Sequence, residues 1–123
     1  MLDATTSTPA ARVIAIVDDD EDFSDSLAVL LETAGFSSSV YRSVSTFLLC
    51  IDHSIRGVVL DVHMPGLSGP EAIRAILRVS PALTVVTVTG RELPFARQRL
   101  IDAGAAGCLP KPLTIDALLP FFA

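Results

Sequence analysis

Five short blocks of β-prone residues alternate along the chain with segments whose apolar residues recur at helical spacing. Blocks of this length, bounded by glycine, proline or acidic residues, are typical of strands buried in a parallel sheet. The second block is the most polar, and Val40 is its clearest candidate for an inward-facing residue. The blocks are Val13–Val17, Ser38–Arg42, Gly57–Leu60, Leu83–Val88 and Ala106–Pro110.

The segments between and after these blocks predict five helices. Gly35 and Gly104 follow two of them, as expected of the residue just past a helix end. Pro70 suits the first turn of the third helix, whereas Pro120 lacks an amide hydrogen and is expected to kink or end the last one. The predicted helices run from Asp22 to Ala34, from a cap at Ser43 or Ser45 through Ile51, from Pro70 through Leu77, from about Leu93 to Ala103, and from a cap at Thr114 through Leu119.

This alternation predicts an α/β fold, a doubly wound five-stranded parallel sheet with helices on both faces. Right-handed crossovers leave few strand orders, and in the common ones the first strand lies beside the point at which ligands bind. A chain of 123 residues fits one domain. We expect a flexible leader over residues 1–11 and a single domain over residues 12–123.

The composition narrows the range of functions. Half of the residues are hydrophobic and 19% are charged, which excludes an intrinsically disordered chain. The net charge of −5 argues against direct nucleic-acid binding, which needs a basic surface. Cys50 and Cys108 fit no metal-ligand spacing and are expected to be free core thiols in a reducing cytosol. Without a transmembrane run or an apolar signal segment in this sequence, we expect a cytoplasmic location and no membrane contact.

Polar side chains follow four of the predicted strands. Asp18 and Asp19 follow the first strand, Asp61 the third, Thr89 the fourth and Lys111 the fifth. Because parallel strands present their carboxyl ends on one edge of the sheet, these side chains are expected to share a cleft. Each has an ordinary explanation alone, as a cap, a turn residue or a solvated charge, but their joint placement points to a site.

The residue types at this edge suit phosphoryl chemistry. Carboxylates in one cleft repel each other, and Mg²⁺, which takes oxygen ligands, would remove that cost. An aspartate can itself become phosphorylated as a nucleophile. Lys111 is the only lysine among nine basic residues, and its compact ammonium can pair with phosphoryl oxygens, to which Thr89 can donate a hydrogen bond. We therefore interpret Asp61 as a phosphoryl acceptor and the chain as a switch.

Together, these motifs resemble those of the response-regulator receiver domains of bacterial two-component systems. The resemblance runs from about Val13 to Leu119, and the Val-Thr-Gly and Leu-Pro-Lys-Pro sequences are similar to receivers of the nitrogen-fixation regulator type, which have helix-turn-helix output domains. It implies a flavodoxin-like sheet of strand order 2-1-3-4-5. The motifs are Val17–Asp19, Leu60–Gly66 with Gly69, Val88–Gly90 and Lys111–Pro112.

The resemblance implies a role for each acidic residue. Asp61 would accept a phosphoryl group from a histidine of a partner kinase or phosphotransfer protein. Mg²⁺ would be bound by the side chains of Asp19 and Asp61 and by the backbone carbonyl of His63. Asp18 would act mainly through water or by orienting the site.

The resemblance also implies how the signal leaves the site. Thr89 and Lys111 would contact the phosphoryl oxygens, with the Lys111–Pro112 bond cis, and phosphorylation would repack the last helices. The output face would consist of the fourth helix, the fifth strand and the fifth helix, and it would control transcription through a domain or protein outside this chain or through a phosphorylation-dependent homodimer. Members of the family usually have Tyr or Phe at the position of Cys108, so coupling here would use a smaller side chain.

Three other functions fit parts of the pattern. A receiver fold that has lost phosphorylation could act as a docking module, which Cys108 favours mildly and the intact set of site residues disfavours. Asp18 and Asp20 have the Asp-x-Asp spacing of haloacid-dehalogenase phosphatases, but the residues after them do not continue that pattern and no cap domain is present. A flavin or nucleotide binder would need a glycine-rich loop after Val17, where this chain has acids that repel phosphate.

Overall fold

The computed structural model describes residues 13–90 and 94–122, in which strands and helices alternate as the sequence predicts. The leader expected over residues 1–11 and the predicted start of the fourth helix at Leu93 lie outside the described residues. The strands are β2 (Val13–Val17), β3 (Ser37–Tyr41), β4 (Ile55–Asp61), β5 (Thr84–Thr89) and β6 (Gly107–Pro110). The helices are α1 (Glu21–Thr33), α2 (Val44–Cys50), α3 (Gly69–Val79), α4 (Pro94–Ala103) and α5 (Ile115–Phe122).

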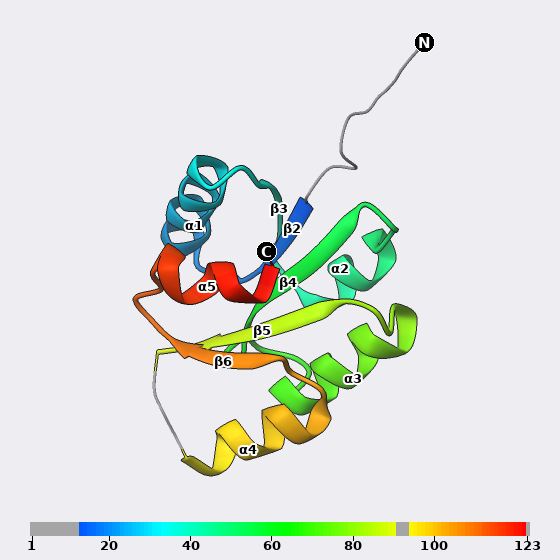
Figure 1. Ribbon diagram of the computed structural model, residues 1–123. Coiled ribbons are helices and arrows are strands. Elements are labelled where there is room, and N and C mark those ends of the chain that lie inside the picture. The colour runs from blue at the N-terminus through cyan, green and yellow to red at the C-terminus, as the bar shows by residue number, and fades with distance from the viewer. Residues whose placement is uncertain (1–12, 91–93, 123) are drawn as a thin grey trace.

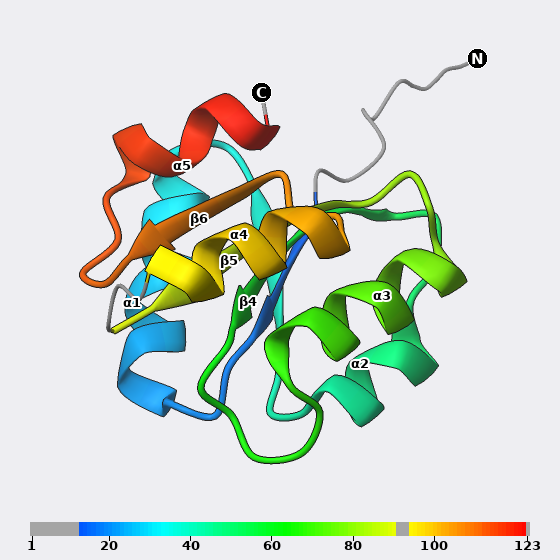
Figure 2. The same ribbon diagram turned by 90° about the horizontal axis from the view of Figure 1, so that it is seen from below.

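The strands form one parallel sheet in the order β3-β2-β4-β5-β6, which is 2-1-3-4-5 in chain order. Helices α1 and α5 cover one face of the sheet, and α2, α3 and α4 cover the other (Figures 1 and 2). The chain reverses its direction across the sheet between β2 and β4. Open α/β sheets bind ligands at such a point, and the carboxyl ends of β2 and β4 carry Asp18 and Asp61 there.

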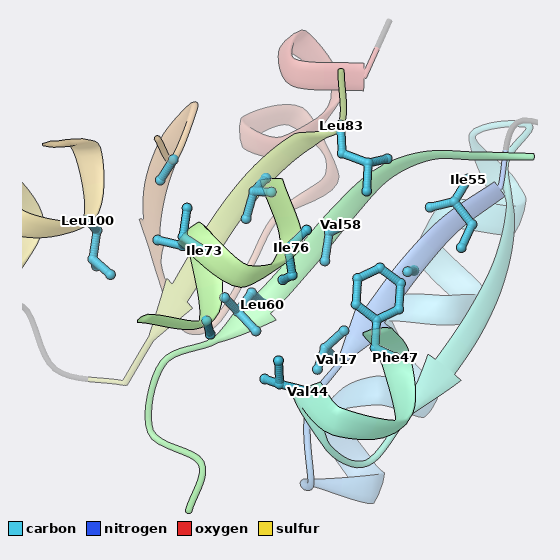
Figure 3. Close-up of a cluster of buried hydrophobic side chains, with 14 of the residues drawn as sticks. Val17, Val44, Phe47, Ile55, Val58, Leu60, Ile73, Ile76, Leu83 and Leu100 are labelled. Carbon is cyan, nitrogen blue, oxygen red and sulfur yellow. The ribbon is translucent and has the colours of Figure 1, made fainter. Parts of the chain in front are cut away.

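Both faces of the sheet are buried in aliphatic cores. On one face, Phe47 from α2 and Ile73 and Ile76 from α3 pack on Val58 and Leu60 of β4 (Figure 3). Burying one such side chain contributes about 1.5–3 kcal/mol, so these contacts hold the central strands that position the site. The core of the other face is built from Ile14, Ile16, Leu27, Leu31, Phe36, Val59, Val86, Val88 and Leu118.

The second strand differs from the prediction. Val40 pairs with the buried Ile16 and so lies on the face of the sheet that α1 and α5 cover, but its side chain is 37% exposed. Strand β3 lies at the edge of the sheet, and on its other face the ring of Tyr41 packs against Phe47 at a centroid distance of 5.1 Å. An edge strand has a neighbouring strand on one side only, so an apolar side chain on it can stay partly exposed on a face that a helix covers.

One further prediction about a single residue is wrong, and a second is wrong in one of its two alternatives. Cys50 is exposed on α2, although both cysteines were expected in the core; Cys108 is buried. Helix α5 also continues through Pro120 to Phe122. The amide hydrogen that Pro120 lacks would bond the carbonyl of Asp116, which is in the first turn of a short helix and on its exposed side, where water can satisfy it. Pro120 is itself exposed, so its ring displaces no core side chain.

The ends of the helices follow the local sequence. Asp20 and Ser43 are the N-caps of α1 and α2, and Ser68 forms a capping box with Glu71 at the start of α3. Gly104, just past the end of α4, has a φ of 119°, a backbone conformation that residues with a side chain rarely adopt. In the two described ranges, no helix has the length and apolar character needed to span a bilayer.

Candidate functional site

Three carboxylates meet at the carboxyl ends of β2 and β4. One oxygen from each of Asp18, Asp19 and Asp61 lies within 4.8 Å of the other two. Asp18 is 1% and Asp61 6% exposed, whereas Asp19 is open to solvent. A cluster made only of carboxylate oxygens suits a hard divalent cation such as Mg²⁺ or Ca²⁺. The residues that the sequence predicted to share a cleft therefore do lie together.

The two buried aspartates are held in the same way. The backbone amide of Asp20 donates to Oδ1 of Asp18 at 2.8 Å, and the amide of His63 donates to Oδ1 of Asp61 at 3.0 Å. An aspartate that accepts from the amide two residues on forms an Asx turn, which fixes the rotamer of the carboxylate. In both residues this leaves Oδ2 to face the remaining partner in the cleft, Lys111.

Lys111 brings the positive charge to these oxygens from the end of β6. Its Nζ lies 3.2 Å from Oδ2 of Asp18 and 3.8 Å from Oδ2 of Asp61. Its backbone amide donates to the carbonyl of Thr89 at 2.8 Å, which ties the end of β6 to the end of β5. The Lys111–Pro112 peptide bond is cis, as the family resemblance implied.

The cleft disfavours the ionised form of Asp18. Burial raises the pKa of Asp18 above its ordinary value of 3.8, and the charge of Asp61 raises it further. The hydrogen bond from Asp20 and the ion pair with Lys111 act in the opposite direction but do not reverse the shift. Burial and the charge of Asp61 thus disfavour the ionised form of Asp18, and a divalent cation in the cleft would favour it.

Thr89 lies at the end of β5 with its hydroxyl 2.5 Å from Nε2 of His63. The family resemblance implies a metal-binding role for the backbone carbonyl of His63, and the contact of its side chain with Thr89 was not predicted. The register of the sheet explains this contact: Asp61 pairs with Val88, so the residues that follow these two lie close together. His63 is exposed, so its ring and the hydroxyl lie at the mouth of the cleft.

Two other contacts were missed by the sequence analysis. Nη1 of Arg42, after β3, donates to the carbonyl of Asp18 at 3.2 Å and to Oγ of Ser24 at 2.8 Å. This guanidinium joins the β2–α1 loop to the neighbouring strand. The ring of Phe23 on α1 lies under Nζ of Lys111, at 4.2 Å from the ring centroid. Neither residue belongs to a motif that sequence reasoning would single out.

A sheet of this order with an acidic cluster at its central strands is the arrangement of a two-component receiver. The chain matches the response regulator receiver domain family over residues 14–122, and it belongs to that family. It is therefore a module of two-component signalling by aspartyl phosphorylation rather than a metabolic enzyme, and a receiver implies a histidine kinase as partner.

Two curated relatives are transcriptional regulators. The chain is 35% identical over 112 residues to the C4-dicarboxylate transport transcriptional regulatory protein DctD of Rhizobium meliloti, covering 89% of this chain and 24% of that protein. It is 33% identical over 113 residues to the transcriptional regulatory protein FixJ of Azorhizobium caulinodans, covering 90% and 53%. The chain thus spans about a quarter and about half of the length of these relatives.

A solved structure with a similar fold is the BeF3-activated receiver domain of DrrB. It superposes with a TM-score of 0.80 at 27% identity and covers 89% of this chain and 92% of that one.

Proposed function

We propose that this receiver is a switch in which Asp61 accepts a phosphoryl group, in the presence of Mg²⁺, from a histidine of a partner kinase or phosphotransfer protein. The observation that carries the proposal is the convergence of Asp18, Asp19 and Asp61 with Lys111 at the two central strands. The DrrB receiver, whose structure is described as BeF3-activated, supports the same chemistry by similarity.

The proposed step is a displacement at phosphorus. Oδ1 of Asp61 is engaged by the amide of His63, which leaves Oδ2, on the side of Lys111, to attack. A P–O bond to the carboxylate forms, the P–N bond of the phosphohistidine breaks, and its electron pair returns to the imidazole of the partner. Such transfers need mainly positioning and neutralisation of charge, and Lys111 supplies a fixed positive charge for the phosphoryl oxygens.

The proposed metal ligands are the side chains of Asp19 and Asp61 and the carbonyl of His63, with Asp18 acting through water or by orienting the site. Mg²⁺ bound there would neutralise the acidic cluster and the incoming phosphoryl oxygens. The raised pKa of Asp18 agrees with this assignment, because burial and the charge of Asp61 both disfavour its ionised form, which a cation in the cleft would favour.

We propose that the hydroxyl of Thr89 gives up its contact with His63 and binds the phosphoryl group instead. This change of partner would draw the end of β5 toward the site. Its neighbours β6, α4 and α5 would then form the output face. Since DctD and FixJ are transcriptional regulators, we propose cytoplasmic control of transcription, through a domain or partner outside this chain or through a phosphorylation-dependent homodimer.

The test is intact mass spectrometry after incubation with phosphoramidate and Mg²⁺. The wild type should gain the mass of one phosphoryl group, and Asp61→Asn should gain none. Asp52→Asn is the matched control, because Asp52 is an exposed aspartate in another loop, and it should behave as the wild type. No gain by a wild type that binds Mg²⁺ would favour a phosphorylation-independent docking module. Labelling that persists in Asp61→Asn but is lost in Asp18→Asn would favour the phosphatase.

A further inference from the structure

We propose that Phe23 is a positioning residue for Lys111: the face of its ring holds the ammonium group over the acidic cleft through a cation–π contact. The inference rests on the proposed function in one respect, namely that Lys111 contacts the phosphoryl group. Phe23 touches none of the reacting groups itself and acts only through the lysine.

Three groups surround the ammonium of Lys111. Two are the carboxylates of Asp18 and Asp61, at 3.2 and 3.8 Å, and the third is the ring of Phe23, whose centroid is 4.2 Å from Nζ. A cation within about 6 Å of a ring centroid is attracted to the negative face of the ring. The lysine therefore bridges the sheet, which supplies the carboxylates, and α1, which supplies the ring.

The contact of Lys111 with the ring of Phe23 should respond differently from its two ion pairs when a metal ion is bound. A divalent cation bound by Asp19 and Asp61, beside Asp18, would compete for the charge of Asp18 and Asp61 and repel the ammonium, so both ion pairs would weaken. The attraction of the ring of Phe23 does not depend on the charge of the carboxylates. Lysine has a flexible four-carbon stem, and the ring is the contact that can keep the ammonium of Lys111 near the phosphoryl position while the metal is bound.

Phe23 is itself well fixed. Its backbone amide donates to the capping carboxylate of Asp20 at 3.1 Å, in the first turn of α1. Its half-buried side chain packs against the core shared by α1 and α5. Together with Leu27, Leu30 and Pro112, it lines a cavity of about 330 Å³ beside the lysine. The ring is thus held from the backbone side and from the core side, with one face turned to Lys111.

Packing of α1 alone could also explain an aromatic ring at this position, and the choice of variants separates the two roles. Phe23→Leu keeps an apolar side chain and removes the ring, whereas Phe23→Tyr keeps the ring. Leu30→Ala is the matched control, because Leu30 lines the same cavity but lies two turns further along the same face of α1, about 10 Å along the helix axis from Phe23. It perturbs the packing of α1 and leaves the cation–π contact in place.

The first measurement uses the single lysine of the chain. In protein labelled with ¹³C-lysine, the Cε–Hε signal belongs to Lys111 alone, and a proton above a ring is shifted upfield by the ring current. We expect this upfield shift in the wild type, in Phe23→Tyr and in Leu30→Ala, and its loss in Phe23→Leu. An unchanged Hε shift in Phe23→Leu would overturn the proposal, whatever its effect on stability.

The second measurement is the rate of phosphorylation by phosphoramidate together with the Mg²⁺ affinity. Phe23→Leu should slow phosphorylation about two- to five-fold, the size that a partly exposed cation–π contact supports, and Phe23→Tyr should restore it, with Mg²⁺ affinity unchanged in both. Equal rates in Phe23→Leu and the wild type would refute the positioning role and leave the proposed function intact. A wild type that is never phosphorylated would refute the proposed function, and the lysine signal would then still decide whether Phe23 holds Lys111.

Discussion

The ring of Phe122 in the last turn of α5 lies directly on Gly57 in the middle of β4, so that a β-carbon at position 57 would overlap the ring. The preceding ring, that of Phe121, has the same relationship to Gly107 of β6. Neither glycine has a left-handed φ. The two glycines are therefore explained by the space that they leave for two rings, which fix the end of α5 on the sheet.

Replacing Gly57 by alanine should destabilise the fold. The added methyl group must displace the ring of Phe122, and overpacking of this kind costs about 1–3 kcal/mol. The free energy of unfolding, measured by urea denaturation, should fall by that amount. In the double variant Gly57→Ala/Phe122→Ala the methyl group has space, so the cost should be smaller than the sum of the two single changes.

Gly90→Ala is the control for this comparison. Nothing lies within 4 Å of a β-carbon placed at Gly90, and its φ is not left-handed, so its effect on unfolding should stay within about 0.5 kcal/mol. If Gly57→Ala were equally mild and additive with Phe122→Ala, the ring would not rest on Gly57 in solution.

Removing the charge of Lys111 should separate metal binding from the phosphoryl response. In Lys111→Ala, Asp18 and Asp61 lose a competing cation at 3.2 and 3.8 Å, so Mg²⁺ should bind at least as tightly as in the wild type. The response to beryllofluoride should weaken, because a charged contact to the phosphoryl position is missing. Titration calorimetry with Mg²⁺ and amide chemical shifts with beryllofluoride measure the two effects.

Lys111→Arg tests whether charge alone is enough. A guanidinium is planar and broader than an ammonium, and the cleft holds Lys111 between two carboxylates and the ring of Phe23. We expect arginine to leave the beryllofluoride response weak. A full response in this variant would show that the site accepts any positive charge and that the exceptional use of lysine has no steric basis.

The sequence predicted the sheet and the acidic cleft because both depend on local patterns and a general rule. Apolar runs define strands, and parallel strands end at one edge, so Asp61 and Lys111 could be placed together without knowing a single contact. The strand order came from the family resemblance, since chain alternation alone leaves more than one order. The structure confirms both.

What the sequence did not predict depends on tertiary contacts that have no local signal. Val40 is apolar yet exposed, because the edge position of β3 decides its surroundings. Pro120 was expected to kink or end α5, yet the helix does not end there and continues to Phe122, since Pro120 lies near both the end of the helix and the solvent. The contacts of His63 with Thr89 and of Phe23 with Lys111 join residues 26 and 88 positions apart in the chain, and only the folded sheet brings them together.

His63→Ala should favour the occupied state of the site. The ring of His63 engages the hydroxyl of Thr89, and in the proposed function Thr89 must leave it to reach the phosphoryl group. Removing a competing hydrogen bond is worth about 0.5–1.5 kcal/mol, so beryllofluoride should bind about two- to ten-fold more tightly in the presence of Mg²⁺. Thr89→Val/His63→Ala is the control, in which no hydroxyl remains to be released, and adding His63→Ala to Thr89→Val should then change nothing.

The raised pKa of Asp18 predicts how stability depends on pH without divalent cations. A carboxyl group with a raised pKa binds its proton more tightly in the folded chain than in the unfolded one. Its contribution to stability is therefore complete below the ordinary value of 3.8 and is lost as the pH rises through the higher pKa of the folded state. Asp18→Asn cannot titrate, so its free energy of unfolding relative to the wild type should be highest at neutral pH and should decline toward acid.

Asp52→Asn provides a control of opposite sign. Hydrogen bonds from the hydroxyl and amide of Ser54 lower the pKa of Asp52, so its charge stabilises the fold above the ordinary pKa and this contribution is lost in acid. Urea denaturation in EDTA over a series of pH values should give opposite trends for the two variants. Mg²⁺ at a hundred times its dissociation constant should then add about 2.7 kcal/mol to the wild type and less to Asp18→Asn. Parallel trends would mean that the surroundings of Asp18 do not disfavour its ionised form. The electrostatic argument for a cation in the cleft would then fail.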